Sequence, residues 1–319
     1  MIVSRENKAT ASRRKERQML DHRTETFLKV CETMNFTAAA NTLHMTQPAV
    51  SQHIRALEKS YGCRLFVYEQ KQLRLTEEGK ILLNAAKTMR NDDRALREKI
   101  SSAGVEAPHE YRIGATMTVG EHAIIKPISG FLTKNPDCLI ELTVANTDEL
   151  LEKLRRGLIH FAVIEGYFPA AEFEHEVFST EKYIPVCAAS HQFETEPESL
   201  KELTNQRLIM REKGSGTRDI MEKNLQAHGL RTESFSRRME VSSLTAILGL
   251  VREDCGITFL YETAAGQEIR AGRLREIHLR DFVVEHDFTF IWNRGSIYSD
   301  EYRRICRLLR AESADRRGY

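Results

Sequence analysis

The stretch FTAAANTLHMTQPAVSQHIRALEKSYGCRLF, residues 36–66, decides what kind of protein this chain is. Three alanines follow Thr37, a residue that can cap a helix, and their lack of bulk lets another helix approach closely. Thr46 is suited to cap a second helix, with Pro48 in the first turn, where a missing N–H group does no harm. Gly62 is suited to end that helix. The stretch therefore predicts two short helices joined by a tight turn.

The second of these helices has two different faces. Apolar residues recur on one side at helical spacing, namely Ala49, Val50, Ile54 and Leu57. The opposite side carries amide, hydroxyl and guanidinium groups, on Gln47, Ser51, Gln52 and Arg55. Such groups can reach base edges when a helix lies in the major groove. Any three-helix bundle can show the same spacing, so periodicity alone leaves a purely structural bundle open.

The order of residue types resembles the winged helix-turn-helix of the LysR-type transcriptional regulators. Residues 36–66 are similar to that motif almost position for position, and LRLTEEGKILL, residues 73–83, is similar to the end of its wing. The resemblance covers residues 22–85 and implies that Lys71 lies on the wing, beside the minor groove or the backbone. Together with the face of the helix, it predicts DNA contacts by Thr46, Gln47, Pro48, Ser51, Gln52, Arg55 and Lys71.

Two positions depart from the family pattern. Gln52 stands where many members have Arg, and an amide pairs with adenine, whereas Arg favours guanine. Tyr68 stands where the pattern has another Arg, so one phosphate contact is lost or is made by a hydroxyl.

A long helix is predicted after the wing, over residues 77–104, with Thr76 as its cap. Apolar residues recur along it at alternating spacings of four and three with one polar break, at Leu82, Ala86, Met89, Asp93, Leu96 and Ile100. This heptad seam favours pairing between two copies of the helix. We therefore expect a homodimer, and a homotetramer stays open.

From residue 109 onward, short strands alternate with helices, a pattern typical of α/β proteins with a parallel sheet. The family resemblance implies a periplasmic-binding-protein-like effector domain at 109–312, with subdomain I at 109–165 and 264–312 and subdomain II at 166–263. The expected fold is thus multidomain. A basic extension (1–21), an all-α winged helix-turn-helix (22–80) and the linker helix precede a two-subdomain α/β domain. The implied hinges lie near Glu165–Gly166 and Tyr261–Thr263.

Ligands of such folds lie beyond the carboxyl ends of the strands. That rule places Thr116 and Thr118 on one wall, and REKGSGTRDI, residues 211–220, supplies Ser215 and Thr217 opposite. Helix N-termini with hydroxyls suit a small carboxylate or oxyanion. Ser242 is either a third contact or part of a helix cap, and a plain glycine turn capped by Ser215 or Thr217 is an alternative for the loop.

Catalysis is not expected. The loop lacks the P-loop spacing, and the chain has no nucleophile elbow and no HExxH motif. The six cysteines stand singly, without zinc spacing. We therefore expect no catalytic residue, no metal and no cofactor.

Charge divides the chain. Residues 1–100 hold 19 Lys and Arg against 12 Asp and Glu, whereas the remainder holds 28 against 34. This asymmetry indicates that the first hundred residues meet a polyanion, although a solvated basic arm explains part of it. No apolar run approaches the roughly 20 residues of a membrane helix, and no signal peptide is recognisable. We expect a cytoplasmic protein without membrane contact.

The resulting hypothesis is a transcriptional regulator that binds double-stranded promoter DNA and whose binding or bending of DNA is modulated by a small-molecule effector. RNA polymerase is a further expected partner. The alternative is a solute-binding module for a small anion.

Overall fold

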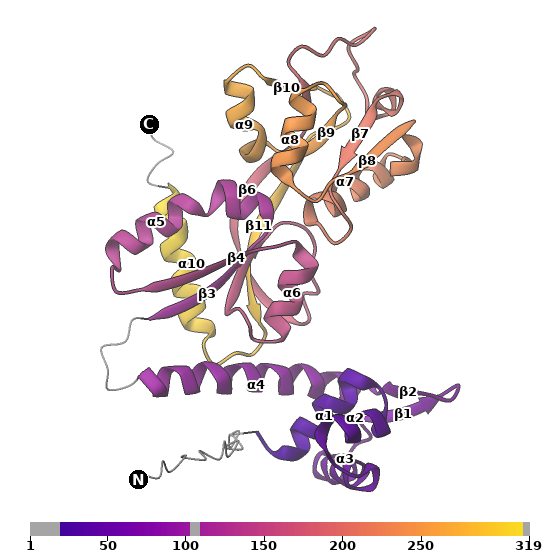
Figure 1. Ribbon diagram of the computed structural model, residues 1–319, viewed down its shortest axis with the longest axis vertical. Coiled ribbons are helices and arrows are strands. Elements are labelled where there is room, and N and C mark those ends of the chain that lie inside the picture. The colour runs from indigo at the N-terminus through magenta and orange to yellow at the C-terminus, as the bar shows by residue number, and fades with distance from the viewer. Residues whose placement is uncertain (1–19, 103–108, 315–319) are drawn as a thin grey trace, which may run out of the picture. The chain divides into compact units, whose positions relative to one another are not determined.

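The computed structural model describes residues 20–102 and 109–314, and it divides along the chain into two compact units, with the boundary between Asp93 and Arg94 (Figure 1). The basic extension predicted at residues 1–21 lies almost entirely outside the described residues. Each unit has hydrophobic cores of its own.

The first unit is a three-helix bundle with a β-hairpin, and a long helix follows it. Its elements are α1 (His22–Thr33), α2 (Phe36–Leu43), α3 (Gln47–Tyr61), β1 (Phe66–Glu69), β2 (Gln72–Leu75) and the first part of α4 (Glu77–Ser102), which continues past the boundary. The core of the bundle is apolar and includes Phe27, Val50, Ile54 and Leu57. The predicted helix-turn-helix and linker helix are therefore present, and β1 and β2 form an antiparallel wing.

Local sequence explains most of the helix ends in this unit. The side chain of Thr46 accepts a hydrogen bond from a backbone N–H of the first turn of α3, and Gly62 ends the helix in the left-handed conformation at φ 68°. The prediction that Thr37 caps α2 is wrong. Asn35 is the cap, because its side chain accepts from two backbone N–H groups, that of Thr37 among them.

The first subdomain of the second unit contains the predicted parallel strands. It holds β3 (Glu110–Ala115) between β4 (Leu139–Val144) and β5 (Phe161–Ile164). Its helical segments are a π-helical turn (Val119–Ala123), α5 (Ile125–Lys134), α6 (Thr147–Arg155) and α10 (Ser299–Ala314). Because the parallel strands point the same way, Thr116 and Glu165 follow β3 and β5 at the same edge of the sheet.

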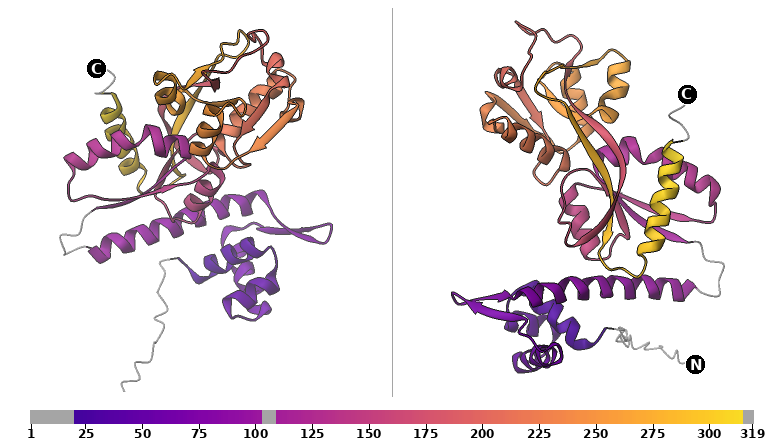
Figure 2. Two further views of the ribbon diagram at one scale, coloured as in Figure 1. Left: turned by 45° about the horizontal axis from the view of Figure 1, so that its top comes forward. Right: turned by 180° about the vertical axis from the view of Figure 1, so that it is seen from behind.

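Two long antiparallel strands connect the subdomains. β6 (Phe173–Ala188) and β11 (Val284–Asn293) lie side by side between them (Figure 2). The sheet runs in the order β10-β6-β11-β5-β3-β4, and β9 also pairs with β6. The sheet is therefore mixed, whereas the alternation of strands and helices predicted a parallel one.

The second subdomain packs helices around a smaller set of strands. Its elements are a 3-10 helix (Leu200–Asn205), β7 (Arg207–Met210), α7 (Gly216–Ala227), a 3-10 turn (Thr232–Ser234), β8 (Arg237–Glu240), α8 (Leu244–Arg252), β9 (Thr258–Tyr261), α9 (Glu262–Arg270) and β10 (Leu274–Glu276). Residues 264–276 were expected in the first subdomain. The structure differs, because β10 pairs with the end of β6 and Ala264 packs in the core with Leu260.

Within the described residues, no helix is both long and apolar enough to cross a membrane.

Candidate functional site

The outer face of α3 is polar and open to solvent. Gln47, Gln52 and Arg55 are exposed, and Ser51 is half-buried, while the apolar face of the helix is covered by the bundle. Arg55 has no ion-pair partner among the residues that the structure describes, so its guanidinium is available to a phosphate or a base. The residues predicted to read a groove thus lie on the solvent-facing side of α3, and their contact with DNA stays a prediction.

The N-terminus of α3 is ordered by contacts within the chain. Thr46 caps it, and Pro48 occupies the first turn. The Gln47 side-chain amide donates a hydrogen bond to Ser51 Oγ at 3.0 Å. The side chains of Gln47 and Ser51 thus contact each other across one helical turn, and this contact limits the rotamers of the Gln47 amide.

Lys71 lies at the tip of the wing. It and Gln70 both have positive φ values, 63° and 49°, as the two central residues of a tight hairpin turn require. The Lys71 side chain is exposed, as is Tyr68, of which 70% is accessible. The wing therefore presents an ammonium group and a phenol ring to its surroundings.

The four predicted hydroxyl residues of the two walls come together in the second unit. Thr116, Thr118, Ser215 and Thr217 are all at least 98% buried. Glu165 joins the two walls, because its backbone N–H donates to Thr116 Oγ1 at 3.2 Å and its Oε1 accepts from Thr217 Oγ1 at 2.7 Å. Glu165 is itself only 1% exposed.

Several buried polar atoms around Glu165 have no hydrogen-bond partner in the structure. They are Thr118 Oγ1, Glu165 Oε2, Arg211 Nη1, Ser215 Oγ and Tyr261 OH. We call Thr116, Thr118, Glu165, Arg211, Ser215, Thr217 and Tyr261 the buried polar cluster. Each unpaired buried polar atom costs free energy, so a concentration of them at one place marks unmet hydrogen-bonding capacity that a polar group could satisfy.

Burial raises the pKa of Glu165 above its usual value of 4.5, because the charged carboxylate loses its hydration. The hydrogen bond from Thr217 and the positive charge of Arg211 oppose this rise without cancelling it. Thr118 also lies close enough to lower this pKa, although its Oγ1 has no partner in hydrogen-bonding geometry. The Glu165 carboxyl therefore keeps its proton to a higher pH than an exposed glutamate.

The two arginines of the loop have different roles. Arg218 is buried and pairs with Glu222 and Glu240, both at 2.6 Å, so it stabilises the fold. Arg211 is 2% exposed and pairs through Nε and Nη2 with the adjacent Glu212 carboxylate, but its Nη1 stays unpartnered. Arg211 is thus the charged donor of the cluster.

The start of α7 fits tightly against the segment that follows β5. A Cβ atom on Gly216 would lie 2.1 Å from the Glu165 carbonyl oxygen, and one on Gly166 would lie 2.5 Å from the Gly216 Cα. Gly166 also has a φ of 89°, which side chains disfavour. Ser215 is the N-cap residue of α7, yet its side chain makes no capping bond. The capped-turn alternative is therefore wrong for Ser215.

Some site residues differ from expectation. Ser242 is exposed, so the structure does not bring it together with the buried polar cluster, and its neighbour Ser243 caps α8. The sequence reading missed the role of Glu165 and of Tyr261, which it placed only near hinges. The described residues contain no group of three His, Cys, Asp or Glu side chains that could hold a metal ion.

Two family profiles match the chain. One, described as "Bacterial regulatory helix-turn-helix protein, lysR family", covers residues 22–80. The other, "LysR substrate binding domain", covers residues 106–314. Together they span both units of the structure.

Individual proteins match over most of their length. The HTH-type transcriptional regulator CysL of Bacillus subtilis is 29% identical over 274 residues, which are 84% of this chain and 89% of CysL. Full-length LysG from Corynebacterium glutamicum, solved with bound effector Arg, is 18% identical, with a TM-score of 0.61 over 93% of this chain and 99% of LysG. The CcmR regulatory domain of Synechocystis PCC6803, solved in complex with 2-PG, is 18% identical, with a TM-score of 0.58 over 65% of this chain and 99% of that domain.

Proposed function

The chain belongs to the LysR family of DNA-binding transcriptional regulators, and from that membership we propose that a small carboxylate or oxyanion in the buried polar cluster controls how it binds promoter DNA. In this proposal α3 enters the major groove with Gln47, Ser51, Gln52 and Arg55 toward the DNA, and Lys71 of the wing contacts the minor groove or the backbone. Thr46 and Pro48 hold the N-terminus of α3 close to the phosphates.

The observation that carries the effector proposal is the set of unpartnered groups around Glu165. Four of these groups can donate a hydrogen bond in their ordinary protonation states, namely two hydroxyls, a phenol and a guanidinium, and Glu165 can also donate when it is protonated. An anion with several oxygen atoms accepts such bonds, and the donation from Arg211 is strengthened by its charge. The raised pKa of Glu165 supports this chemistry, since an ionised carboxylate would repel the ligand.

Burial implies that the ligand enters through motion. The four hydroxyls and Glu165 are nearly inaccessible, and the Gly216 backbone lies directly against the segment that follows β5. We propose that β6 and β11, the strands that connect the two subdomains, act as the hinge. The subdomains move apart about this hinge to admit the effector and then close around it. An effector that binds the closed form better shifts the population toward that form.

The proposed assembly is a homodimer formed along α4, with a homotetramer as the higher state. Leu82 packs against the core of the first unit and Ala86 is buried, so the N-terminal half of the predicted seam is already used within one chain. Met89 and Ile100 are 57% and 62% exposed and remain available to a second copy. Burial of these two apolar side chains against a second copy of α4 would favour pairing of the two helices.

We further propose that the role is regulatory and not catalytic, and that the protein acts in the cytoplasm, where promoter DNA and RNA polymerase are found. CysL, the relative named above, is a transcriptional regulator, which supports this.

A ligand panel tests the effector proposal by thermal shift of the full-length chain. The panel contains sulfate, phosphate, glycolate and 2-PG, with ethylene glycol as an uncharged contrast. A ligand that binds only the folded state at about a hundred times its Kd adds ~2.7 kcal/mol of stability, or about 5–10 °C for a domain of this size. We expect stabilisation by at least one anion and none by ethylene glycol.

The double variant Ser215→Ala with Thr217→Ala should lose this stabilisation while keeping its affinity for DNA. The matched control replaces exposed residues of the same types, Ser190→Ala with Thr195→Ala, and should respond like the wild type. Stabilisation by none of the anions, or an unchanged anion response in the double variant, would refute the proposed site.

A further inference from the structure

A hollow lies outside the buried polar cluster, where the chain leaves β5. It has a volume of about 380 Å³ and is open to solvent. Its lining comes from three segments: Gly166, Tyr167 and Phe168 after β5, His175 and Val177 on β6, and Glu285, His286, Asp287 and Thr289 on β11. This volume lies within the range of small-molecule sites, roughly 300–1,000 Å³.

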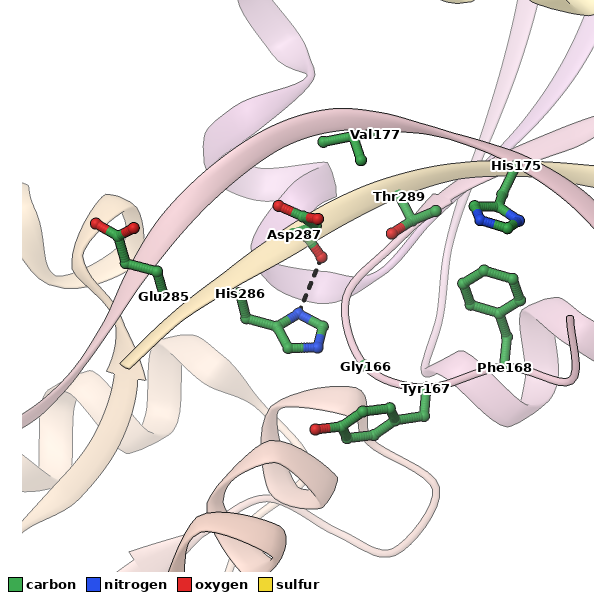
Figure 3. A pocket seen from close by; sticks show the side chains of 9 residues that line it. All are labelled: Gly166, Tyr167, Phe168, His175, Val177, Glu285, His286, Asp287 and Thr289. Carbon is green, nitrogen blue, oxygen red and sulfur yellow. Dashed lines mark hydrogen bonds between the residues drawn. The ribbon is translucent and has the colours of Figure 1, made fainter. Parts of the chain in front are cut away.

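Four rings line this hollow, which we call the hinge pocket. Figure 3 shows Tyr167 facing His286 and Phe168 facing His175. Both pairs meet edge to face, with ring centroids 5.4 Å apart for Tyr167 and His286 and 5.2 Å for Phe168 and His175. Tyr167 is 43% exposed, so much of its surface is free for a ligand.

The charged groups among the lining residues are acidic. Glu285 is exposed and has no ion-pair partner within the described part of the chain. Asp287 is half-buried, and its Oδ1 accepts a hydrogen bond from Thr180 Oγ1 at 2.5 Å, which fixes the carboxylate beside the rings. His286 uses Nδ1 toward the Asp287 carbonyl at 3.0 Å, and burial lowers its pKa, so this ring adds no positive charge at neutral pH.

The structure itself contains an example of the chemistry that such a pocket selects. The Lys223 ammonium, from α7, lies 2.9 Å from the centroid of the Tyr167 ring. Aromatic faces attract cations through their negative quadrupole. Lys223 already covers one face of the Tyr167 ring, so the two carboxylates are what favours a cationic head here, and the exposed remainder of the rings favours an apolar body.

We propose that the hinge pocket is a second ligand site that takes a protonated organic amine, with its ammonium between Glu285 and Asp287 and its apolar part against Tyr167 and Val177. The site is separate from the buried polar cluster and selects the opposite charge. A ligand in the hinge pocket would contact segments that also hold the buried polar cluster. Tyr167 lies two residues after Glu165, and Lys223 belongs to the helix that carries Thr217.

The test uses three ligands that share one ring and differ in charge: benzylammonium, benzyl alcohol and benzoate. Each is titrated into the full-length chain by calorimetry at neutral pH up to millimolar concentrations. Saturable binding of benzylammonium, with weaker or no binding of the other two, is expected. Absence of saturable benzylammonium binding, or tighter binding of benzoate, would overturn the proposal.

Variants locate the binding. Tyr167→Leu and Glu285→Gln should each weaken benzylammonium by about three- to tenfold, in line with the loss of a ring contact or of an ion pair. Glu285 is exposed, so its amide variant keeps the proposal testable if Tyr167→Leu fails to fold. Tyr61→Leu, at an exposed tyrosine of the first unit, should leave the affinity unchanged. Equal binding by wild type and both pocket variants would place the amine elsewhere and refute the site.

Discussion

Replacing Glu165 by Gln should make the effector domain more stable at neutral and alkaline pH. Glu165 is 1% exposed, its Oε1 accepts from Thr217 at 2.7 Å, and its Oε2 has no partner. Glutamine keeps the shape and the acceptor oxygen, and its NH₂ group replaces the acid O–H as a donor. The variant therefore imitates the protonated acid and carries no charge at any pH.

The sign of the pH dependence follows from the raised pKa. Between the usual value of 4.5 and the folded pKa of Glu165, the folded state keeps a proton that the unfolded state has released. The contribution of Glu165 to the stability of the wild type is thus fully present below pH 4.5 and is lost as the pH rises through the folded pKa. Each unit of pKa rise costs about 1.4 kcal/mol, or roughly 3–6 °C in Tm.

Scanning calorimetry of the full-length chain from pH 4.5 to pH 8.5 measures this difference, because it can resolve the transitions of the two units. Wild type and Glu165→Gln should melt at similar temperatures at the acidic end and diverge upward in pH, with the variant more stable. Glu194→Gln, at an exposed glutamate, should follow the wild type throughout. A variant that becomes less stable than the wild type at high pH would show that Glu165 is ionised and paired, and would refute the reasoning.

Three other positions give separate expectations. Gln52→Ala should reduce the preference for the specific site over random DNA by about 1–3 kcal/mol in competition gel shifts, and an equal loss on both DNAs would argue against base reading. Lys71→Ala should lower the slope of log K against log salt by roughly 0.9, and an unchanged slope would remove Lys71 from the phosphate contacts. Gly216→Ala, whose Cβ would meet the Glu165 carbonyl at 2.1 Å, should destabilise the effector domain by about 1–3 kcal/mol in calorimetry. Gly249→Ala, in a helix with open space around it, should be neutral or stabilising, and equal effects at both glycines would contradict the close approach.

The fold of the first unit could be predicted from local sequence signals. Thr46, Pro48 and Gly62 act within one helical turn of their own positions, so their roles follow from neighbouring residues. Asn35 and Thr37 show the limit of this approach. Both residue types can cap a helix, and the backbone of the preceding turn placed Asn35 in the capping position.

Long-range contacts explain what the sequence reading missed. Thr217 is 52 residues from Glu165 in the chain, so no local pattern links their side chains. The boundary expected near residue 264 failed for a related reason. β6 is 16 residues long and pairs with β11 in the first subdomain and with β9 and β10 in the second, which keeps α9 and β10 in the second subdomain.

The central claim is that an anion held by Ser215 and Thr217 changes how the dimer binds DNA. DNase footprinting of the protein's own upstream region, with and without an anion that stabilises it in the thermal-shift panel, tests this claim most directly. The wild-type footprint should change in extent or occupancy when the anion is added. Ser215→Ala with Thr217→Ala should keep the ligand-free footprint and show no change. A double variant that responds like the wild type, or a wild type whose footprint ignores the anion, would contradict the account.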